Sequence, residues 1–281
     1  MEKSESRLKI IKKIEELEKQ QKWDCDVEDD PVTTPLLPNK IDYLNKKLSS
    51  KIATFFANKT GTAFYENLIK KRQFIIKEVI GIENFLAIKD KGAIITCNHF
   101  NVCDNYAVWR SIKPHVGKKE RLYKVIREGN YTNSPPPFGF ILRHCNTLPL
   151  SSNADTMKKF MRAINVLLKS GKKILVYPEQ AMWWNYKKPR PFKSGAFRFA
   201  ATNMVPVLPF FITMKDSDVL DSDGFYVQEY YVHILPAIYP DLNKTRNVNM
   251  EEMKDKNYQA WKEVYENFYN QKLTYLKWET S

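Results

Sequence analysis

From residue 73 onward, short apolar runs typical of β-strands alternate with stretches of helical periodicity. The helical patterns fall between several of these runs, most clearly at residues 104–112 and 155–170. Alternation of this kind favours an α/β fold in which helices cover a mixed sheet. The expected strands are Phe74–Ile80, Ala93–Cys97, Tyr123–Ile126, Thr147–Pro149, Ile174–Tyr177, Pro206–Thr213 and Tyr230–Leu235.

The most informative segment follows the second of these runs and reads Asn-His-Phe-Asn-Val-Cys-Asp over residues 98–104. His99 lies where a strand ends, and Asp104 begins the next helical pattern. A carboxylate that accepts the Nδ1 proton fixes the imidazole tautomer and leaves Nε2 free to deprotonate a hydroxyl. The spacing is weak evidence alone, because it also occurs by chance. In its context it predicts a general base.

A second acidic residue, Glu179, follows the expected strand 174–177. The carboxyl ends of strands in an α/β sheet form the usual ligand-binding edge. We therefore expect His99 and Glu179 at the same edge, with Glu179 accepting a hydrogen bond from a bound hydroxyl. The alternative is that Glu179 caps the next turn, although Asp or Ser performs that role better.

Together these segments resemble the glycerolipid acyltransferases of the lysophosphatidic acid acyltransferase family, over about residues 76–240. The family blocks read Asn-His-x4-Asp, a Gly-centred second block, Phe-Pro-Glu-Gly-Thr-Arg and Val-Pro-x-x-Pro. The matching segments here are residues 98–104, residues 136–140 around Gly139, Tyr177-Pro178-Glu179, and residues 205–209.

The resemblance implies acyl transfer from acyl-CoA or acyl-carrier protein to a lysolipid hydroxyl, by family default that of 1-acylglycerol 3-phosphate. His99 would be the general base and Asp104 its orienting partner, with no covalent intermediate, no cofactor and no metal. Gly139 would let the backbone approach closely before the next strand. The sequence lacks the Gly-x-Ser-x-Gly turn of a serine hydrolase, which agrees with this interpretation.

Two family blocks depart from the pattern where the family carries arginines associated with the acceptor phosphate. The second block ends in Leu-Pro-Leu-Ser at residues 148–151, and Gln-Ala-Met at residues 180–182 replaces Gly-Thr-Arg. Neither Ser151 nor Met182 can replace a guanidinium. Two outcomes stay open. Either the acceptor lacks a terminal phosphate, as a glycolipid does, or a nearby basic run rebuilds the anion site with Lys187, Lys188, Arg190 and Lys193.

Residues 1–72 are expected to form a basic, amphipathic helical extension before an acyltransferase domain at 73–281. Helical patterns occur at residues 4–21 and 39–72, the latter predicted as two helices with Gly61 between them, and residues 24–38 are expected to be a linker. The extension either docks on an anionic membrane or packs on the domain. A final covering helix is expected within residues 251–278.

The net charge of +13 over 281 residues predicts attraction to anionic membrane surface or to an acidic acyl-carrier protein. The longest apolar run, residues 205–214, is shorter than the roughly 20 residues of a spanning helix. Four cysteines without a Cys-x-x-Cys pair, and no secretion signal, favour a reducing compartment. We therefore expect a cytoplasmic protein, peripheral on the inner face of the membrane.

Three other functions are weighed against acyl transfer. A metal site would use His99 and Cys103 with Cys97, Asp104, His144 or Cys145, but a second ligand pair at zinc-like spacing is missing. Nucleic-acid binding is disfavoured because no zinc-finger, RNP or helix-turn-helix signature is present. A catalytically silent acyl-binding or membrane scaffold is disfavoured because both His99 and Asp104 are retained.

Overall fold

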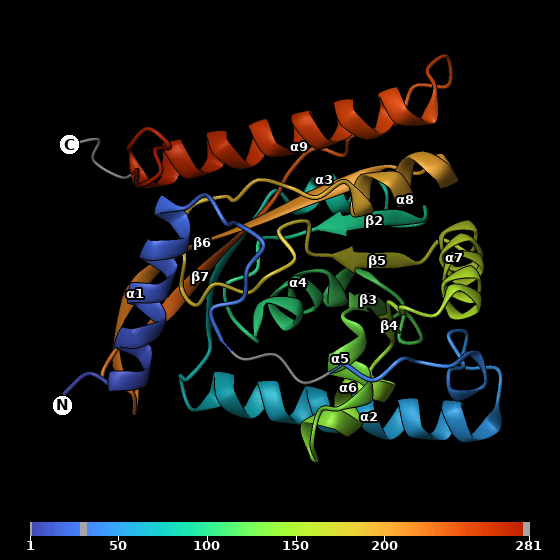
Figure 1. Cartoon of the computed structure of the whole chain (residues 1–281), viewed down its shortest axis with the longest axis horizontal. Helices are drawn as coiled ribbons and strands as arrows, with labels where there is room; N and C mark the ends of the chain where they lie inside the picture. Colours follow the sequence, from blue (N-terminus) through green and yellow to red (C-terminus); the bar gives the residue numbers. More distant parts are fainter. Residues whose placement is uncertain (1, 29–32, 278–281) are drawn as a thin grey trace.

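The computed structural model describes residues 2–28 and 33–277. Within them, seven strands form one sheet in the order β1-β7-β6-β2-β5-β3-β4 (Figure 1). Neighbouring strands pair in parallel except β6 and β7, which are antiparallel. The strands are β1 (Ile75–Ile80), β2 (Ala93–Thr96), β3 (Leu122–Ile126), β4 (Thr147–Pro149), β5 (Lys173–Val176), β6 (Val207–Leu220) and β7 (Tyr226–Ile234).

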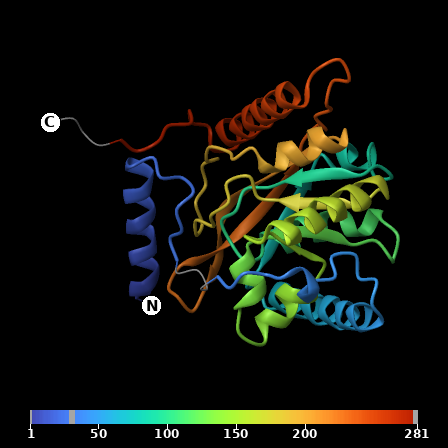
Figure 2. The same cartoon turned by 45° about the vertical axis from the view of Figure 1, so that its right-hand side comes forward.

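Helices lie on both faces of this sheet and along its margins (Figures 1 and 2). The predicted class, a mixed α/β sheet covered by helices, is confirmed. The α-helices are α1 (Glu5–Lys19), α2 (Leu48–Lys70), α3 (Ile82–Leu86), α4 (Asp104–Ile112), α5 (Glu128–Thr132), α6 (Phe138–His144), α7 (Ala154–Lys169), α8 (Gly195–Asn203) and α9 (Arg246–Tyr269), with 3₁₀ turns at Pro38–Lys40 and Lys113–His115.

Strand β2 lies in the interior, and its side chains alternate between two hydrophobic cores. Ile95 joins the core beneath α3 and α4, whereas Ile94 joins the core beneath α7 and α8. All four β2 residues are buried, as expected of a parallel strand covered on both faces. The residue after β2 therefore emerges from a rigid, well-packed element.

Helix α7 shows how local sequence sets its boundaries. The Asn153 side chain accepts hydrogen bonds from the amides of Asp155 and Thr156 and thereby caps the first turn. Apolar residues at helical spacing, among them Phe160, Ile164, Leu167 and Leu168, pack on the sheet.

The N-terminal extension differs from the prediction of two helices between residues 39 and 72. Helix α2 is continuous through Gly61, and residues 41–47 precede it in non-helical conformation. Gly61 is buried at the contact between α2 and α6, where a Cβ would lie 3.8 Å from both Ile141 and Cys145, at ordinary van der Waals distance. One glycine costs a helix about 1 kcal/mol, which is too little to end a helix of 23 residues that packs on its neighbours.

The linker expected at residues 24–38 and the helix expected within 251–278 each extend partly outside the described residues, at 29–32 and from Trp278 onward. Within the described part, the final helix is α9, which begins at Arg246 after a Thr245 cap and ends at Tyr269. Its Trp261 and Tyr265 pack on Phe211 of β6. The covering role is therefore observed, with boundaries earlier than expected.

Gly92, directly before β2, offers a test of this packing. A Cβ built there would lie 1.9 Å from the carbonyl oxygen of Leu168 in α7. We expect Gly92→Ala to lower the free energy of unfolding by about 2 kcal/mol or more, because backbone must move on both sides. Gly117→Ala is the control, since a Cβ at Gly117 would meet nothing within 4 Å. Equal denaturation midpoints for the two variants would contradict this account.

Candidate active site

The loop after β2 is held to the neighbouring strand β6 by a side-chain amide. Asn98 donates to the carbonyl oxygen of Ile212 at 3.0 Å and accepts from the Ile212 amide at 2.8 Å. Asn98 is buried, so both bonds are shielded from water. This pairing fixes the backbone from which the next residue, His99, projects.

His99 and Asp104 meet as the sequence predicted. The His99 Nδ1 lies 3.0 Å from Asp104 Oδ2. The same carboxylate oxygen accepts hydrogen bonds from the backbone amides of Phe100 and Asn101, at 2.8 and 3.0 Å. One carboxylate thus orders both the loop backbone and the imidazole. With Nδ1 directed at Asp104, Nε2 is the ring nitrogen left for chemistry.

Asp104 has no exposed side-chain surface, and burial raises the pKa of its carboxyl above the ordinary value. The hydrogen bond from His99 and the two amides act in the opposite direction. A buried carboxylate that is hydrogen-bonded to Nδ1 stabilises the positive charge that the ring gains when Nε2 takes up a proton. The pair is therefore suited to stabilise an imidazolium formed during proton transfer.

The His99 ring is supported on one side and reachable from solvent. It stacks on Tyr177, which follows β5, with ring centroids 3.9 Å apart and planes 12° apart. Its side chain is 21% exposed. Stacking restricts ring rotation, so the orientation set by Asp104 is reinforced from a second strand end.

Glu179 lies at the same edge, but its contacts differ from the expected ones. Its Oε2 accepts from the His99 amide at 3.1 Å and from Arg190 Nη2 at 2.9 Å, while Oε1 accepts from the Arg190 amide at 2.7 Å. The Glu179 side chain is 2% exposed. In this arrangement Glu179 ties two loops together instead of presenting a carboxylate to a bound hydroxyl.

The predicted basic run does not form an open anion site. Arg190 is buried with Glu179, and Lys187 lies over the ring of Tyr269 at 5.7 Å. The remaining two lysines pair with carboxylates of the N-terminal segment: Lys188 with Glu18 at 2.6 Å, and Lys193 with Asp24 at 2.7 Å. The Lys193 hydrogen bond lowers the pKa of Asp24.

Gly139 lies in α6, where the backbone makes the close approach expected of the second block. A Cβ at Gly139 would lie 2.0 Å from the carbonyl oxygen of Ser134. Helix α6 then leads into β4. This contact packs the first turn of α6 against the backbone at Ser134. The atoms nearest to such a Cβ belong to Ser134 and Arg143, and not to His99.

Sequence reasoning did not assign roles to Asn98 or Tyr177, and it placed Arg190 in an anion site instead of in a pair with Glu179. Asn98 and Tyr177 adjoin motif residues at strand ends, which is the signal that could have drawn attention to them. Arg190 has no comparable signal, because its role depends on a tertiary pairing with Glu179. Among the described residues, no three His, Cys, Asp or Glu side chains come together to hold a metal ion.

The buried pair of Glu179 and Arg190 predicts a large stability effect. Glu179→Ala would leave a buried guanidinium without its partner, so we expect a loss of about 3–5 kcal/mol in unfolding free energy. Chemical denaturation measures it. The control is Glu251→Ala, which removes an exposed partner of Lys254 and should change stability by less than about 1 kcal/mol. A similar small loss for Glu179→Ala would show that the pair does not hold the loops.

Comparison with known proteins identifies the segment that carries this geometry. A family model described as Acyltransferase matches residues 77–213. A search of curated proteins finds no match. Among solved structures, the 1-acyl-sn-glycerophosphate (LPA) acyltransferase PlsC from Thermotoga maritima is 18% identical, with 77% of this chain and 96% of that chain covered and a TM-score of 0.48.

The pilus retraction motor PilT with bound ADP is 9% identical, with 70% of this chain and 63% of that chain covered and a TM-score of 0.32. Both TM-scores lie below 0.5. The family match includes the loop of His99 and Asp104 as well as Glu179. Residues 77–213 of this chain therefore match the acyltransferase family model.

Proposed function

We propose that the chain transfers a fatty acyl group from a thioester, acyl-CoA or acyl-carrier protein, to a hydroxyl of a lysolipid. The observation that carries the proposal is the 3.0 Å contact between His99 Nδ1 and the buried carboxylate of Asp104. The acyltransferase family match over residues 77–213 supports the reaction class. The sequence blocks that resemble glycerolipid enzymes support the choice of lysolipid.

The reaction needs one proton acceptor and no covalent enzyme intermediate. His99 Nε2 removes the proton from the acceptor hydroxyl as its oxygen attacks the thioester carbonyl carbon. The tetrahedral intermediate then collapses, the carbon–sulfur bond breaks, and the thiolate takes the proton back from the imidazolium. The products are an ester and a free thiol. Asp104 stabilises the imidazolium between the two proton transfers.

Variants of His99 and Asp104 test this mechanism with an acyl-CoA and a panel of lysolipids. We expect His99→Ala to lower kcat/KM about a hundredfold or more, as removal of a general base does. Asp104→Asn should lose activity similarly, because a neutral amide cannot stabilise the imidazolium as the buried carboxylate does. Its thermal midpoint should fall, since the hydrogen bonds from the amides of Phe100 and Asn101 to a charged oxygen are weakened or lost. Rates are read by mass spectrometry of the product.

His115→Ala provides the matched control, because His115 is exposed on the turn after α4. Its kcat/KM should equal that of the parent. Acyl transfer by His99→Ala at the parental rate would reject the mechanism and leave the acyl-binding scaffold as the better account.

We also propose that α2 docks the enzyme on an anionic membrane surface. No helix of the described residues is long and apolar enough to cross a bilayer. Helix α2 nevertheless leaves large apolar side chains uncovered, with Leu48 73% and Phe55 61% exposed. Further exposed apolar residues on and beside it are Ile52, Phe56, Phe64, Val102, Phe138 and Phe140.

This apolar surface is connected to the active-site loop. The Tyr65 hydroxyl of α2 donates to the carbonyl oxygen of Val102, three residues after His99. The ring of Phe64 packs edge-on against Phe138 of α6 at 5.9 Å. Lysines 47, 51, 59, 70 and 71 are exposed on or at the ends of the helix. Apolar side chains flanked by lysines suit an interfacial helix on anionic lipid. The cytoplasmic location remains a prediction.

The docking surface is tested by Phe55→Ser/Phe56→Ser. We expect this double variant to lose at least half of its co-sedimentation with anionic liposomes, because two exposed aromatic side chains no longer enter the headgroup region. Leu242→Ser is the control, since Leu242 is exposed in the loop before α9. Helix α9 lies on the opposite side of the molecule from α2 (Figure 1). Binding that is unchanged in the Phe55/Phe56 variant would end the docking proposal.

A further inference from the structure

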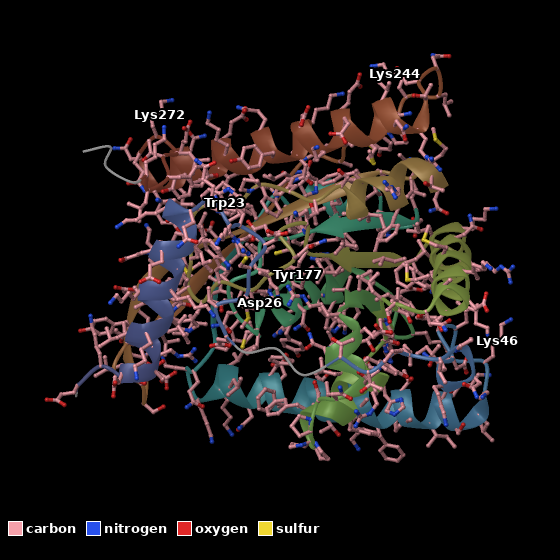
Figure 3. All side chains as sticks on the ribbon, viewed as in Figure 1. Trp23, Asp26, Lys46, Tyr177, Lys244 and Lys272 are labelled. Carbon is pink, nitrogen blue, oxygen red and sulfur yellow. The ribbon has the colours of Figure 1, made fainter. Side chains whose placement is uncertain are left out.

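The last residues of α1 and the segment that follows them lie against the edge of the sheet where His99 emerges. We call residues 18–28 the acidic strap, after its carboxylates Glu18, Asp24, Asp26 and Glu28. In Figure 1 the arrowheads of β2 and β5 point toward the side where α1 and this segment lie. Figure 3 labels Trp23 and Asp26 of the strap on the same side of the sheet as Tyr177.

Backbone contacts hold the strap on the loop that follows Glu179. The carbonyl oxygen of Trp23 accepts from Arg190 Nη1 at 2.8 Å, and that of Cys25 accepts from Trp183 Nε1 at 2.8 Å. Trp183 in turn donates its amide to the His99 carbonyl oxygen at 3.1 Å. The strap is therefore connected to the backbone of the catalytic loop through one intervening residue.

The strap carboxylates pair with the cations of this edge. Besides the pairs Glu18–Lys188 and Asp24–Lys193, Asp26 Oδ2 lies 2.6 Å from Arg127 Nη1. Arg127 comes directly after β3, which pairs with β5, the strand that leads into Tyr177. Arg127 was not among the residues singled out from the sequence.

These ion pairs determine how well the cations of this edge can bind an anion. A terminal phosphate carries a charge of about −1.5 to −2 at neutral pH and is held by guanidinium or ammonium groups free to donate to it. Here Arg127, Lys188 and Lys193 each donate to a carboxylate, and Arg190 is buried with Glu179. A phosphate would have to displace these carboxylates and then remain beside them, which like-charge repulsion disfavours.

We propose that the acidic strap makes the acceptor site selective for lysolipid hydroxyls whose head group carries no terminal phosphate. The inference rests on the acyl-transfer function proposed above and narrows its acceptor. The missing family arginines left two possibilities open, an acceptor without a terminal phosphate or an anion site rebuilt by the basic run. The inference selects the first. The strap carboxylates pair with Arg127, Lys188 and Lys193, three of the cations that an anion site at this edge would use.

The test compares 1-acylglycerol with 1-acylglycerol 3-phosphate, at equal acyl chain, in the same neutral detergent micelles and with the same acyl-CoA. We expect the parent to favour the uncharged acceptor in kcat/KM by about tenfold or more, the effect of one unfavourable charge contact. Asp24→Asn/Asp26→Asn should shift the ratio toward the phosphate by a similar factor. Asp24→Asn alone, which changes a half-exposed pair, should shift it less, in the same direction.

Glu28→Gln is the matched control within the strap, because Glu28 pairs with Arg7 of α1 and not with an edge cation. Its acceptor ratio should equal that of the parent. A parent that prefers the phosphate acceptor, or strap variants that keep the parental ratio, would overturn the inference while leaving acyl transfer intact. Transfer to neither acceptor, or transfer that survives His99→Ala, would instead reject the proposed function and this inference with it.

Discussion

The hydrogen bonds of one buried carboxylate organise the active-site loop. Asp104 accepts from the imidazole of His99 and from the amides of Phe100 and Asn101 through a single oxygen. Any movement of the loop that breaks one of these bonds leaves a desolvated charge less well satisfied, which is costly. The same bonds therefore stabilise the loop conformation and set the imidazole tautomer. The loop backbone and the orientation of His99 therefore both depend on the Asp104 carboxylate.

Around this group, the edge is built from ion pairs that belong to different parts of the chain. Glu179 and Arg190 join the loops after β5 and β2, and the acidic strap joins the N-terminal segment to the same region. The chain is strongly basic overall, yet Arg127, Lys188, Arg190 and Lys193 at this edge each pair with a local carboxylate. Excess positive charge instead flanks α2, whose exposed apolar side chains face away from the core. The proposed membrane-docking surface and the proposed acceptor selectivity therefore involve different parts of the molecule.

Much of the fold could be predicted from the sequence because the central strands β2 and β5 are buried on both faces. The pattern around Ala93–Cys97 and the cap before α7 are local signals, and the matching elements lie within a few residues of their predicted bounds. The contact between His99 and Asp104 was also accessible, since both residues belong to one short loop. The N-terminal helices were harder to predict, because Gly61 was expected to separate two helices, whereas α2 continues through it along its contact with α6. Helix propensity alone does not indicate that tertiary contact.

The roles of Glu179 and the basic run were beyond sequence reasoning for the same reason. Which carboxylates pair with Lys188 and Lys193 depends on an N-terminal segment more than 160 residues away in the sequence. Long-range pairing of charges leaves no periodic pattern, so residues 24–28 of the acidic strap were interpreted as part of a linker. Tyr177 adjoins a motif and was only partly predictable. Its position at a strand end follows from the sequence, but its stacking against the His99 ring does not.

The most direct test of the account is the tautomer of His99, read from long-range proton–nitrogen correlations of the imidazole by NMR and assigned with the His99→Ala variant. At a pH where the ring is neutral, the account predicts a proton on Nδ1, bonded to Asp104, and an unprotonated Nε2. A neutral ring that carries its proton on Nε2 would contradict it, because that nitrogen could not then accept a proton from the acceptor hydroxyl.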